Sequence, residues 1–416
     1  MTRDPASPRP AGGTRVPAAS GRLLTLPSPT DRITRGLLRK ADGGSPLRPG
    51  KRAWVTFDAG HAAWTLVLDG PQMRMVHGRV PGAGTVVRVD TRTLADIVDG
   101  RDSGVHAFLD GRLVMRGNLA LVLQLDGADD PARPPHFPRA RRRDVLEVST
   151  FYLEAGSGRP VVLLHGLGAT NASMLPTFVD LAPDHWVIAP DLPGFGDSGK
   201  PVRAYDPAFY ARWLEAFLDA VGIDRAVLVG NSMGGRIAIE VGLQCPSRVA
   251  ALVLFAPSLA FKRFREATPL VRLLAAELGA MPLVMPRPLV LTALRMMFAR
   301  PERLRDTWYD AAADEFLRVF ATPRGRMAFL SAARQIYLEE AHGEAGFWDR
   351  LGALTPPALF LWGDADQLVP WRFSRHVEAL LPDARSVVLE DCGHVPQFEH
   401  RERTHALVRE FLRAVS

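Results

Sequence analysis

The chain has 416 residues and a mass of 45.5 kDa, so at about 150 residues per domain we expect two or three domains. Hydrophobic residues make up 47% and charged residues 23%, which is ordinary globular usage and excludes a chain that is disordered throughout. The two cysteines, Cys245 and Cys392, cannot form a disulfide framework, and neither lies in a CxxC or Cys/His cluster. The sequence therefore argues against zinc and redox chemistry.

The positive charge is concentrated at the front of the chain. Residues 1–143 carry 23 Lys and Arg against 13 Asp and Glu, whereas the remainder carries 28 against 32. Because 47 of the 51 cations are Arg, we attribute the excess to genome composition; no base-reading motif accompanies it, and nucleic-acid binding is not expected. The basic region still allows peripheral contact with an anionic membrane. No apolar run reaches membrane-spanning length and no signal peptide is evident, so we expect a cytoplasmic protein.

The first part of the chain predicts a flexible tail followed by a small α+β domain. Residues 1–30 are rich in Pro, Ala, Ser, Gly and Arg, which is typical of a disordered tail. Short helices are predicted over 31–40 and 93–98, where apolar residues fall on one face. Period-two or continuous apolar runs, separated by Asp-Gly and Pro-Gly turns, predict strands over 53–57, 63–68, 73–76, 85–89, 108–109, 113–115 and 119–125. The pattern indicates one domain over residues 31–126.

Residues 127–143 contain four prolines and end in a cluster of arginines. Such a segment has little apolar surface to bury, and proline keeps it extended. We therefore predict a solvated linker between two domains.

From residue 144 to residue 416 the pattern changes to alternating strands and helices. Short continuous apolar runs, typical of parallel strands buried on both faces, lie at 161–164, 186–189, 226–229, 251–255, 358–362 and 386–389. Helical stretches between them, such as 207–221, 236–245 and 371–381, predict right-handed crossovers and an open α/β sheet. Residues 258–354 contain no strand candidate and several proline-separated helical segments, so we expect a helical cap above the sheet.

Ser232 is the candidate nucleophile. It lies in Gly-Asn-Ser-Met-Gly-Gly, directly after a predicted strand and before a predicted helix, the context of a nucleophile elbow. A serine on such a tight turn has a strained backbone, and small neighbours allow the strand and the helix to approach closely. The side chain would project at the carboxyl ends of the strands, where open α/β sheets bind ligands.

A serine hydroxyl requires a base, and the base requires an acid that orients it. Asp366 and His394 each follow a predicted strand, in the order Ser, Asp, His that is known for this constellation. Asp364 is the rival acid, but two residues earlier it suits a turn that points elsewhere. The other known acid position, after the strand 251–255, offers only Ala-Pro-Ser.

The oxyanion of a tetrahedral intermediate needs backbone donors. The N–H of Met233, next to the nucleophile, is one candidate, and the loop His-Gly-Leu-Gly at 165–168 offers Leu167 as the second. His165 competes with His394 for the role of base, but its place before the glycine turn favours a bracing role.

Residues 145–416 resemble the α/β-hydrolase superfamily, on the motifs HGLG, DLPGFGDSG, GNSMGG, WGDAD and DCGHVPQFEH. The resemblance implies hydrolysis through an acyl-serine intermediate without a metal or an organic cofactor. With Asn231, the GNSMGG form is similar to the carbon–carbon bond hydrolases of aromatic degradation, and esterases also carry it.

Residues 31–126 resemble the lipid-binding fold of the sterol carrier proteins, most recognisably over AFLDGRLVMRGN. That resemblance implies an apolar tunnel between a curved sheet and helices, able to hold an acyl chain or a sterol. Any small α+β core, however, also needs alternating apolar residues. In the cap, Met and Phe side chains favour an apolar substrate; they are residues 281, 285, 296, 297, 298, 316, 320, 327 and 329.

We expect a serine hydrolase of lipophilic carboxylic esters or thioesters, with an N-terminal domain that binds the acyl chain. Two alternatives remain open. One is a carbon–carbon bond hydrolase, whose substrate carboxylate would meet a cap arginine such as Arg263, Arg295 or Arg300. The other is a lipid carrier without catalysis.

Overall fold

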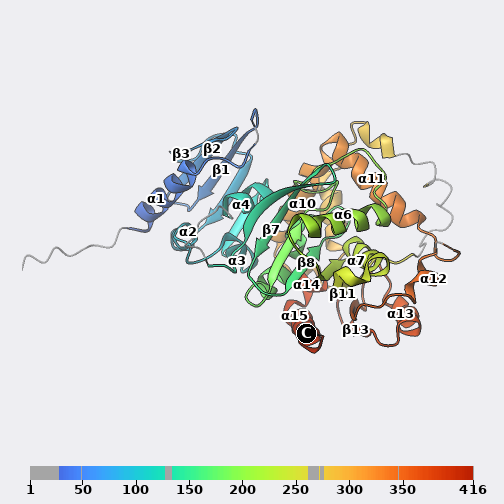
Figure 1. Cartoon of the computed structure of the whole chain (residues 1–416). Helices are drawn as coiled ribbons and strands as arrows, with labels where there is room; N and C mark the ends of the chain where they lie inside the picture. The colour runs from blue at the N-terminus through green and yellow to red at the C-terminus, as the bar shows by residue number, and fades with distance from the viewer. Residues whose placement is uncertain are drawn as a thin grey trace, which may run out of the picture.

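The computed structural model describes residues 28–47, 49–126, 134–260, 271, 276–344 and 346–415. Two sheets, one of five strands and one of eight, form the centres of two adjoining domains (Figure 1). Of the predicted tail, residues 1–27 lie outside the described residues. Pro29 and Thr30 already belong to the first helix, because the Ser28 side chain accepts a hydrogen bond from the Asp31 N–H and caps it.

The front domain contains the five-stranded sheet, with strand order β3-β2-β1-β4-β5. Its strands are β1 (Arg52–Asp58), β2 (Ala63–Asp69), β3 (Gln72–His77), β4 (Thr85–Val89) and β5 (Leu113–Arg116). All neighbours pair antiparallel except β1 and β4, which are parallel. The helices are α1 (Pro29–Asp42), α2 (Thr91–Val98), α3 (Gly104–Leu109) and α4 (Leu119–Asp126).

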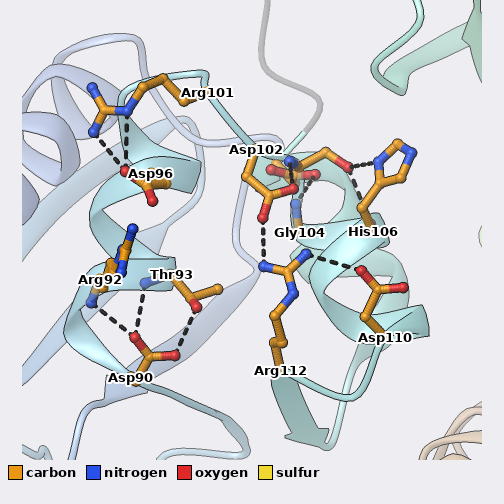
Figure 2. A network of polar contacts seen from close by, with 12 residues as sticks. Asp90, Arg92, Thr93, Asp96, Arg101, Asp102, Gly104, His106, Asp110 and Arg112 are labelled. Carbon is orange, nitrogen blue, oxygen red and sulfur yellow. Dashed lines mark hydrogen bonds and ion pairs between the residues drawn. The ribbon is translucent and has the colours of Figure 1, made fainter.

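Polar side chains fix where α2 and α3 begin (Figure 2). The Asp90 carboxylate accepts the backbone N–H groups of Arg92 and Thr93, both at 2.9 Å, and so caps α2. Across the next turn, Arg112 donates to Asp102 at 2.5 Å and to Asp110 at 3.1 Å. The Arg112 contacts join both ends of α3 to the residue that precedes β5.

Two predicted strands of the front domain are helices. Phe108 and Leu109 end α3, and residues 119–125 form most of α4. The α4 segment has no alternation because nearly all of its side chains are buried, between α3 of the front domain and β6 and α10 of the second domain. A short apolar run that is buried on all sides gives no period by which a helix is distinguished from a strand.

The prediction of a solvated linker over residues 127–143 is wrong for residues 139–143, which belong to a strand. Residues 127–133 lie outside the described residues, but β6 (Arg139–Val145) pairs antiparallel with β7 (Val148–Ala155) through a two-residue turn with positive φ at both positions. The arginines find partners in the fold: Arg141 donates to Glu154 at 2.8 Å, and the Arg142 guanidinium lies 5.2 Å from the centre of the Phe151 ring. Neighbouring strands thus supply contacts that the segment's own composition does not reveal.

The second domain is built on the eight-stranded sheet, in the order β13-β12-β11-β10-β8-β9-β7-β6. Its remaining strands are β8 (Pro160–Leu164), β9 (Trp186–Pro190), β10 (Ala226–Asn231), β11 (Val249–Phe255), β12 (Ala358–Gly363) and β13 (Arg385–Leu389). Strands β8 to β13 pair in parallel, as predicted, and the antiparallel β6 and β7 extend one edge.

Helices cover both faces of this sheet, and the strand side chains alternate between them. Val162 and Leu164 pack with α6 (Pro207–Ala220), α7 (Met233–Gln244) and α13 (Ser374–Leu380). Val161 and Leu163 pack toward α5 (Leu175–Leu181) and α15 (Arg401–Ala414), which follows the short α14 (Pro396–Glu399). The core of the front domain is continuous with this second layer, so the two domains share one apolar interior.

The expected cap is helical over its described residues. It contains α9 (Arg287–Arg295), α10 (Asp306–Phe320), α11 (Pro323–Leu338) and α12 (Phe347–Leu351), with 3-10 turns η4 (Ala276–Ala280) and η5 (Pro301–Arg303). Within the ranges that the structure describes, no helix combines the length and the apolar character needed to cross a bilayer.

Candidate active site

Ser232 lies in the turn between β10 and α7 with φ 53° and ψ −116°. A non-glycine residue in that region costs about 1–3 kcal/mol. Three backbone hydrogen bonds hold the turn: the Ser232 N–H donates to Phe255 O at 3.0 Å, and the Ser232 carbonyl accepts from Ser258 at 2.9 Å and from Arg236 at 3.0 Å. The strained geometry of a nucleophile elbow is therefore built into this turn.

The glycines around Ser232 are required by close backbone approach. A Cβ on Gly234 would lie 2.1 Å from the carbonyl oxygen of Leu164 in β8, and one on Gly230 would lie 2.4 Å from the carbonyl carbon of Gly234. A side chain at either position would push the helix away from the strands. This is the steric reason for the sequence pattern.

The structure brings Asp366 and His394 together. The Nδ1 atom of His394 lies 2.7 Å from Oδ2 of Asp366, and only 4% and 1% of the two side chains are exposed. The other oxygen of Asp366 accepts the N–H groups of Leu368 at 2.7 Å and Val369 at 3.0 Å. An ionised carboxylate only accepts, so Nδ1 carries the proton and Nε2 has the lone pair that a general base needs.

The rival carboxylate does not reach the histidine ring. Asp364 is exposed, and its Oδ1 accepts the backbone N–H of Cys392 at 3.2 Å. It therefore shapes the turn before the histidine loop, whereas Asp366 contacts the base.

Asn231 connects the serine turn with the histidine loop. Its Nδ2 donates to Phe255 O at 3.0 Å and to the backbone carbonyl of His394 at 3.1 Å. The residue before the serine is thus hydrogen-bonded to the residue that carries the base. The sequence offered only a family variant at this position, and no local signal predicts the bridge.

The loop at 165–168 lies against the serine, since a Cβ on Gly166 would be 3.4 Å from Cβ of Ser232. Met233 begins α7 directly after Ser232, and Leu167 follows Gly166 in the loop; their roles as oxyanion donors stay predictions. The ring of His165 is fully buried: Nδ1 contacts Gly166 O at 2.8 Å, and Nε2 accepts the N–H of Leu192 at 2.9 Å. Burial lowers its pKa to about 4, so the ring is neutral and braces the loop.

Glu399, at the end of α14, connects the cap with the loop that carries His394. The sequence alone predicted no role for this residue. Its carboxylate accepts the N–H of Gly393 at 2.7 Å and, from the cap, the N–H groups of Ala299 at 3.2 Å and Arg300 at 2.7 Å. The N–H of His394 itself donates to the cap carbonyl of Met297 at 2.6 Å. These hydrogen bonds tie the backbone of Gly393 and His394 to the cap.

We expect Glu399→Gln to lower kcat about tenfold with little change in KM, because an amide replaces a charged acceptor of three N–H groups. Steady-state kinetics on an ester substrate measure the effect, and Glu402→Gln, an exposed glutamate on α15, is the matched control. Unchanged kcat in a folded Glu399→Gln variant would contradict this positioning role.

A small aromatic pocket lies above the loop at 165–168. It has a volume of about 10 Å³ and is lined by Gly168, Phe195, Phe316, Val319, Phe320, Gly325 and Phe329. The rings of Phe316 and Phe320 stack at 5.4 Å, and that of Phe329 meets both edge-on. Three of the cap residues expected to favour an apolar substrate thus meet here, whereas Met281 and Met296 are about half exposed, at 57% and 49%.

A small apolar cavity lies in the front domain, where the resemblance implies a lipid tunnel. A cavity of about 10 Å³ lies between α3, β5 and α4, and Leu175 of the second domain contributes to its wall. That is about the space one water occupies, whereas pockets for drug-sized ligands span about 300 Å³ or more. An acyl chain enters only if these elements move apart.

Comparison with known proteins assigns both domains. A family model described as alpha/beta hydrolase fold matches residues 159–401, and a model of the SCP-2 sterol transfer family matches residues 37–128. The class is thus a two-domain hydrolase with a helical cap, as the sequence predicted. The chain belongs to the α/β-hydrolase family, with an N-terminal SCP-2 domain.

Individual relatives extend the comparison. A 2-hydroxy-6-oxo-6-phenylhexa-2,4-dienoate hydrolase from Burkholderia cepacia is 30% identical over 281 residues, which cover 62% of this chain and 89% of the relative. The crystal structure of a membrane phospholipase A, a bacterial virulence factor, has a TM-score of 0.57 and 25% identity, covering 78% of this chain and 96% of that one. A thermophilic esterase from Thermogutta terrifontis has a TM-score of 0.56 and 25% identity, covering 67% and 99%.

Proposed function

We propose that the protein hydrolyses lipophilic carboxylic esters or thioesters through an acyl-enzyme on Ser232. The observation that carries the proposal is the buried Asp366–His394 pair, hydrogen-bonded through Asn231 to the strained turn of Ser232. The aromatic side chains that the cap places against the loop at 165–168 support an apolar substrate, but the pocket they enclose, about 10 Å³, admits an acyl group only if α10 or α11 moves. The esterase and the phospholipase among the similar structures agree with this substrate class.

The proposed reaction has two halves. Oγ of Ser232 attacks the acyl carbon while His394 Nε2 takes its proton, and the N–H groups of Met233 and Leu167 receive the oxyanion. His394 returns the proton to the departing alcohol or thiol, which leaves an acyl-serine. Water, deprotonated by the same nitrogen, then attacks the acyl-serine, and the acid is released with the serine regenerated. In both halves, Asp366 keeps a proton on Nδ1 of His394.

The front domain would supply a second apolar site on the same chain once α3, β5 and α4 move apart. Holding an acyl chain there would raise its effective concentration at the active site, because the two domains are joined. The shared apolar core and the SCP-2 family match support this role.

Carbon–carbon bond hydrolysis is the second candidate, favoured by the dienoate hydrolase relative. Such a substrate carries a carboxylate, and the cap arginines considered for it are engaged elsewhere. Arg295 pairs with Asp306 at 2.7 Å and Arg300 with Asp391 at 2.9 Å, while Arg263 lies outside the described residues. This arrangement favours the ester reaction. The third candidate is a lipid carrier without catalysis. Lipid transport does not require a buried Asp366–His394 pair, so the pair favours an enzyme.

Turnover of nitrophenyl esters of graded acyl length, beside a 2-hydroxy-6-oxo-dienoate acid, separates these candidates. We expect kcat/KM for the best ester to exceed that for the dienoate at least about 100-fold, a difference of about 2.7 kcal/mol in transition-state stabilisation. The reverse preference would assign the carbon–carbon reaction. If the protein turns over neither class of substrate, the lipid carrier without catalysis is the remaining candidate.

A further inference from the structure

Helix α10 of the cap contacts β5 and α4 of the front domain, and its Phe316 and Phe320 line the aromatic pocket. Near its start, Trp308 donates from Nε1 to the carbonyl of Phe108 in the front domain at 3.3 Å. The Trp308 ring also lies 6.4 Å from that of Phe108 and 5.5 Å from that of Phe398 in α14. One side chain thus contacts the front domain, the cap and the helix that follows the histidine loop.

Two turns further along α10, Asp314 binds the front domain and the cap at once. Its Oδ2 accepts from Arg116 Nε at 2.7 Å and from the Gly117 N–H at 2.9 Å, at the end of β5. Its Oδ1 accepts from Arg287 of α9 at 3.1 Å. Burial alone would raise the pKa of Asp314, but these hydrogen bonds outweigh it and hold the pKa below its ordinary value. At neutral pH the carboxylate is therefore ionised, and both of its oxygens accept hydrogen bonds.

A second connection runs through Asp197, in the loop after β9. Gln124 of α4 in the front domain donates to Asp197 Oδ2 at 2.7 Å, and Arg318 of α10 pairs with Asp197 Oδ1 at 2.8 Å. The front domain thus holds α10 near its beginning, its middle and its end.

The opposite side of α10 forms the wall of the aromatic pocket. Phe316 and Phe320 are one turn apart, and Phe316 is two residues from Asp314, which places it about 200° around the helix. A Cβ on Gly168 would lie 3.1 Å from the Phe316 ring, so the ring rests on the loop that follows Leu167. The contacts that anchor α10 to the front domain therefore also set the distance between the Phe316 ring and this loop.

We propose that Asp314 and Arg116 are positioning residues through which the SCP-2 domain fixes α10 and thereby selects the size of the acyl group. This inference rests on the proposed ester hydrolysis at Ser232. When the anchor is removed, α10 is free to shift, and acyl groups of different length are discriminated less. The front domain is then part of the specificity apparatus of the hydrolase, whether or not it carries a lipid.

The test compares full-length Arg116→Ala and Asp314→Asn with matched controls that remove the same groups. The controls are Arg52→Ala, whose partner Asp69 lies within the front domain, and Asp306→Asn, which starts the same helix and pairs with Arg295 inside the cap. For each variant, kcat/KM is measured on nitrophenyl esters of graded acyl length, and amide hydrogen exchange is measured over residues 306–320.

We expect the ratio of kcat/KM between the best and the poorest acyl length to fall at least about fivefold in both anchor variants, mainly through KM, and to change less than about twofold in the controls. Exchange over 306–320 should accelerate in the anchor variants alone. An unchanged acyl profile in folded Arg116→Ala protein would overturn the proposal. If the wild type hydrolyses no ester, the proposed function fails, and exchange over 306–320 equal to that of the controls would overturn the anchoring separately.

Discussion

Replacing Ser232 with alanine is expected to leave the fold intact and to reduce ester turnover by about 10⁴-fold or more. The backbone hydrogen bonds of the turn do not involve the hydroxyl, so Phe255 and Ser258 still hold it. Loss of Oγ removes the atom that forms the acyl-enzyme, and what remains is binding and oxyanion stabilisation. Steady-state kinetics measure the loss, and thermal unfolding verifies the fold.

Ser374→Ala is the matched control for this experiment. Ser374 is a buried serine at the start of α13, 2% exposed, and its loss removes the same hydroxyl group from a site outside the catalytic loops. We expect its kcat/KM to stay within about threefold of the wild type. Retained turnover in Ser232→Ala would rule out this serine as the nucleophile.

Replacing Asp366 with asparagine is expected to lower kcat by about 10³- to 10⁴-fold while the histidine loop keeps its shape. The asparagine oxygen can still accept the N–H groups of Leu368 and Val369, but its amide nitrogen would then face Nδ1 of His394. That contact favours the tautomer with the proton on Nε2, which cannot accept the proton of Ser232. The same substitution thus changes one proton position and little else.

Asp364→Asn is the natural counterpart, two residues away in the same loop. Because Asp364 contacts a backbone N–H and not the imidazole, we expect its kcat to remain within about threefold of the wild type. A larger loss in Asp364→Asn than in Asp366→Asn would exchange the roles assigned to the two acids.

The placement of the candidate site is largely predictable from sequence because a parallel sheet brings the carboxyl ends of its strands to one edge. Ser232, Asp366 and His394 each follow a continuous apolar run, and those runs are strands β10, β12 and β13. Choosing Asp366 over Asp364 follows from the length of the turn, and the structure places only the former against the histidine ring.

The incorrect sequence predictions concern segments whose structure depends on partners far away in the chain. Residues 119–125 are apolar except for Gln124 because α4 is buried between the two domains, and this arrangement leaves no helical period in the sequence. The arginine-rich segment 139–145 looks unable to order itself, yet pairing with β7 and ion pairs with Glu154 and Asp197 hold it as a strand. Neither outcome is encoded within the segment.

The residues that connect the cap to its surroundings are hidden for the same reason. Glu399 binds backbone groups about 100 residues earlier, and Asp314 binds a front-domain arginine 198 positions away. A single carboxylate in a helix carries no sign of such partners. Only the folded arrangement brings each carboxylate to these partners.

Incubating the purified full-length protein with a fluorophosphonate, and identifying the modified peptide by mass spectrometry, tests directly whether Ser232 is the nucleophile. We predict one adduct per chain, on Ser232, which disappears in Ser232→Ala and forms much more slowly in Asp366→Asn. An adduct on another residue, or no adduct on folded protein that hydrolyses esters, would contradict an acyl-enzyme mechanism at this serine.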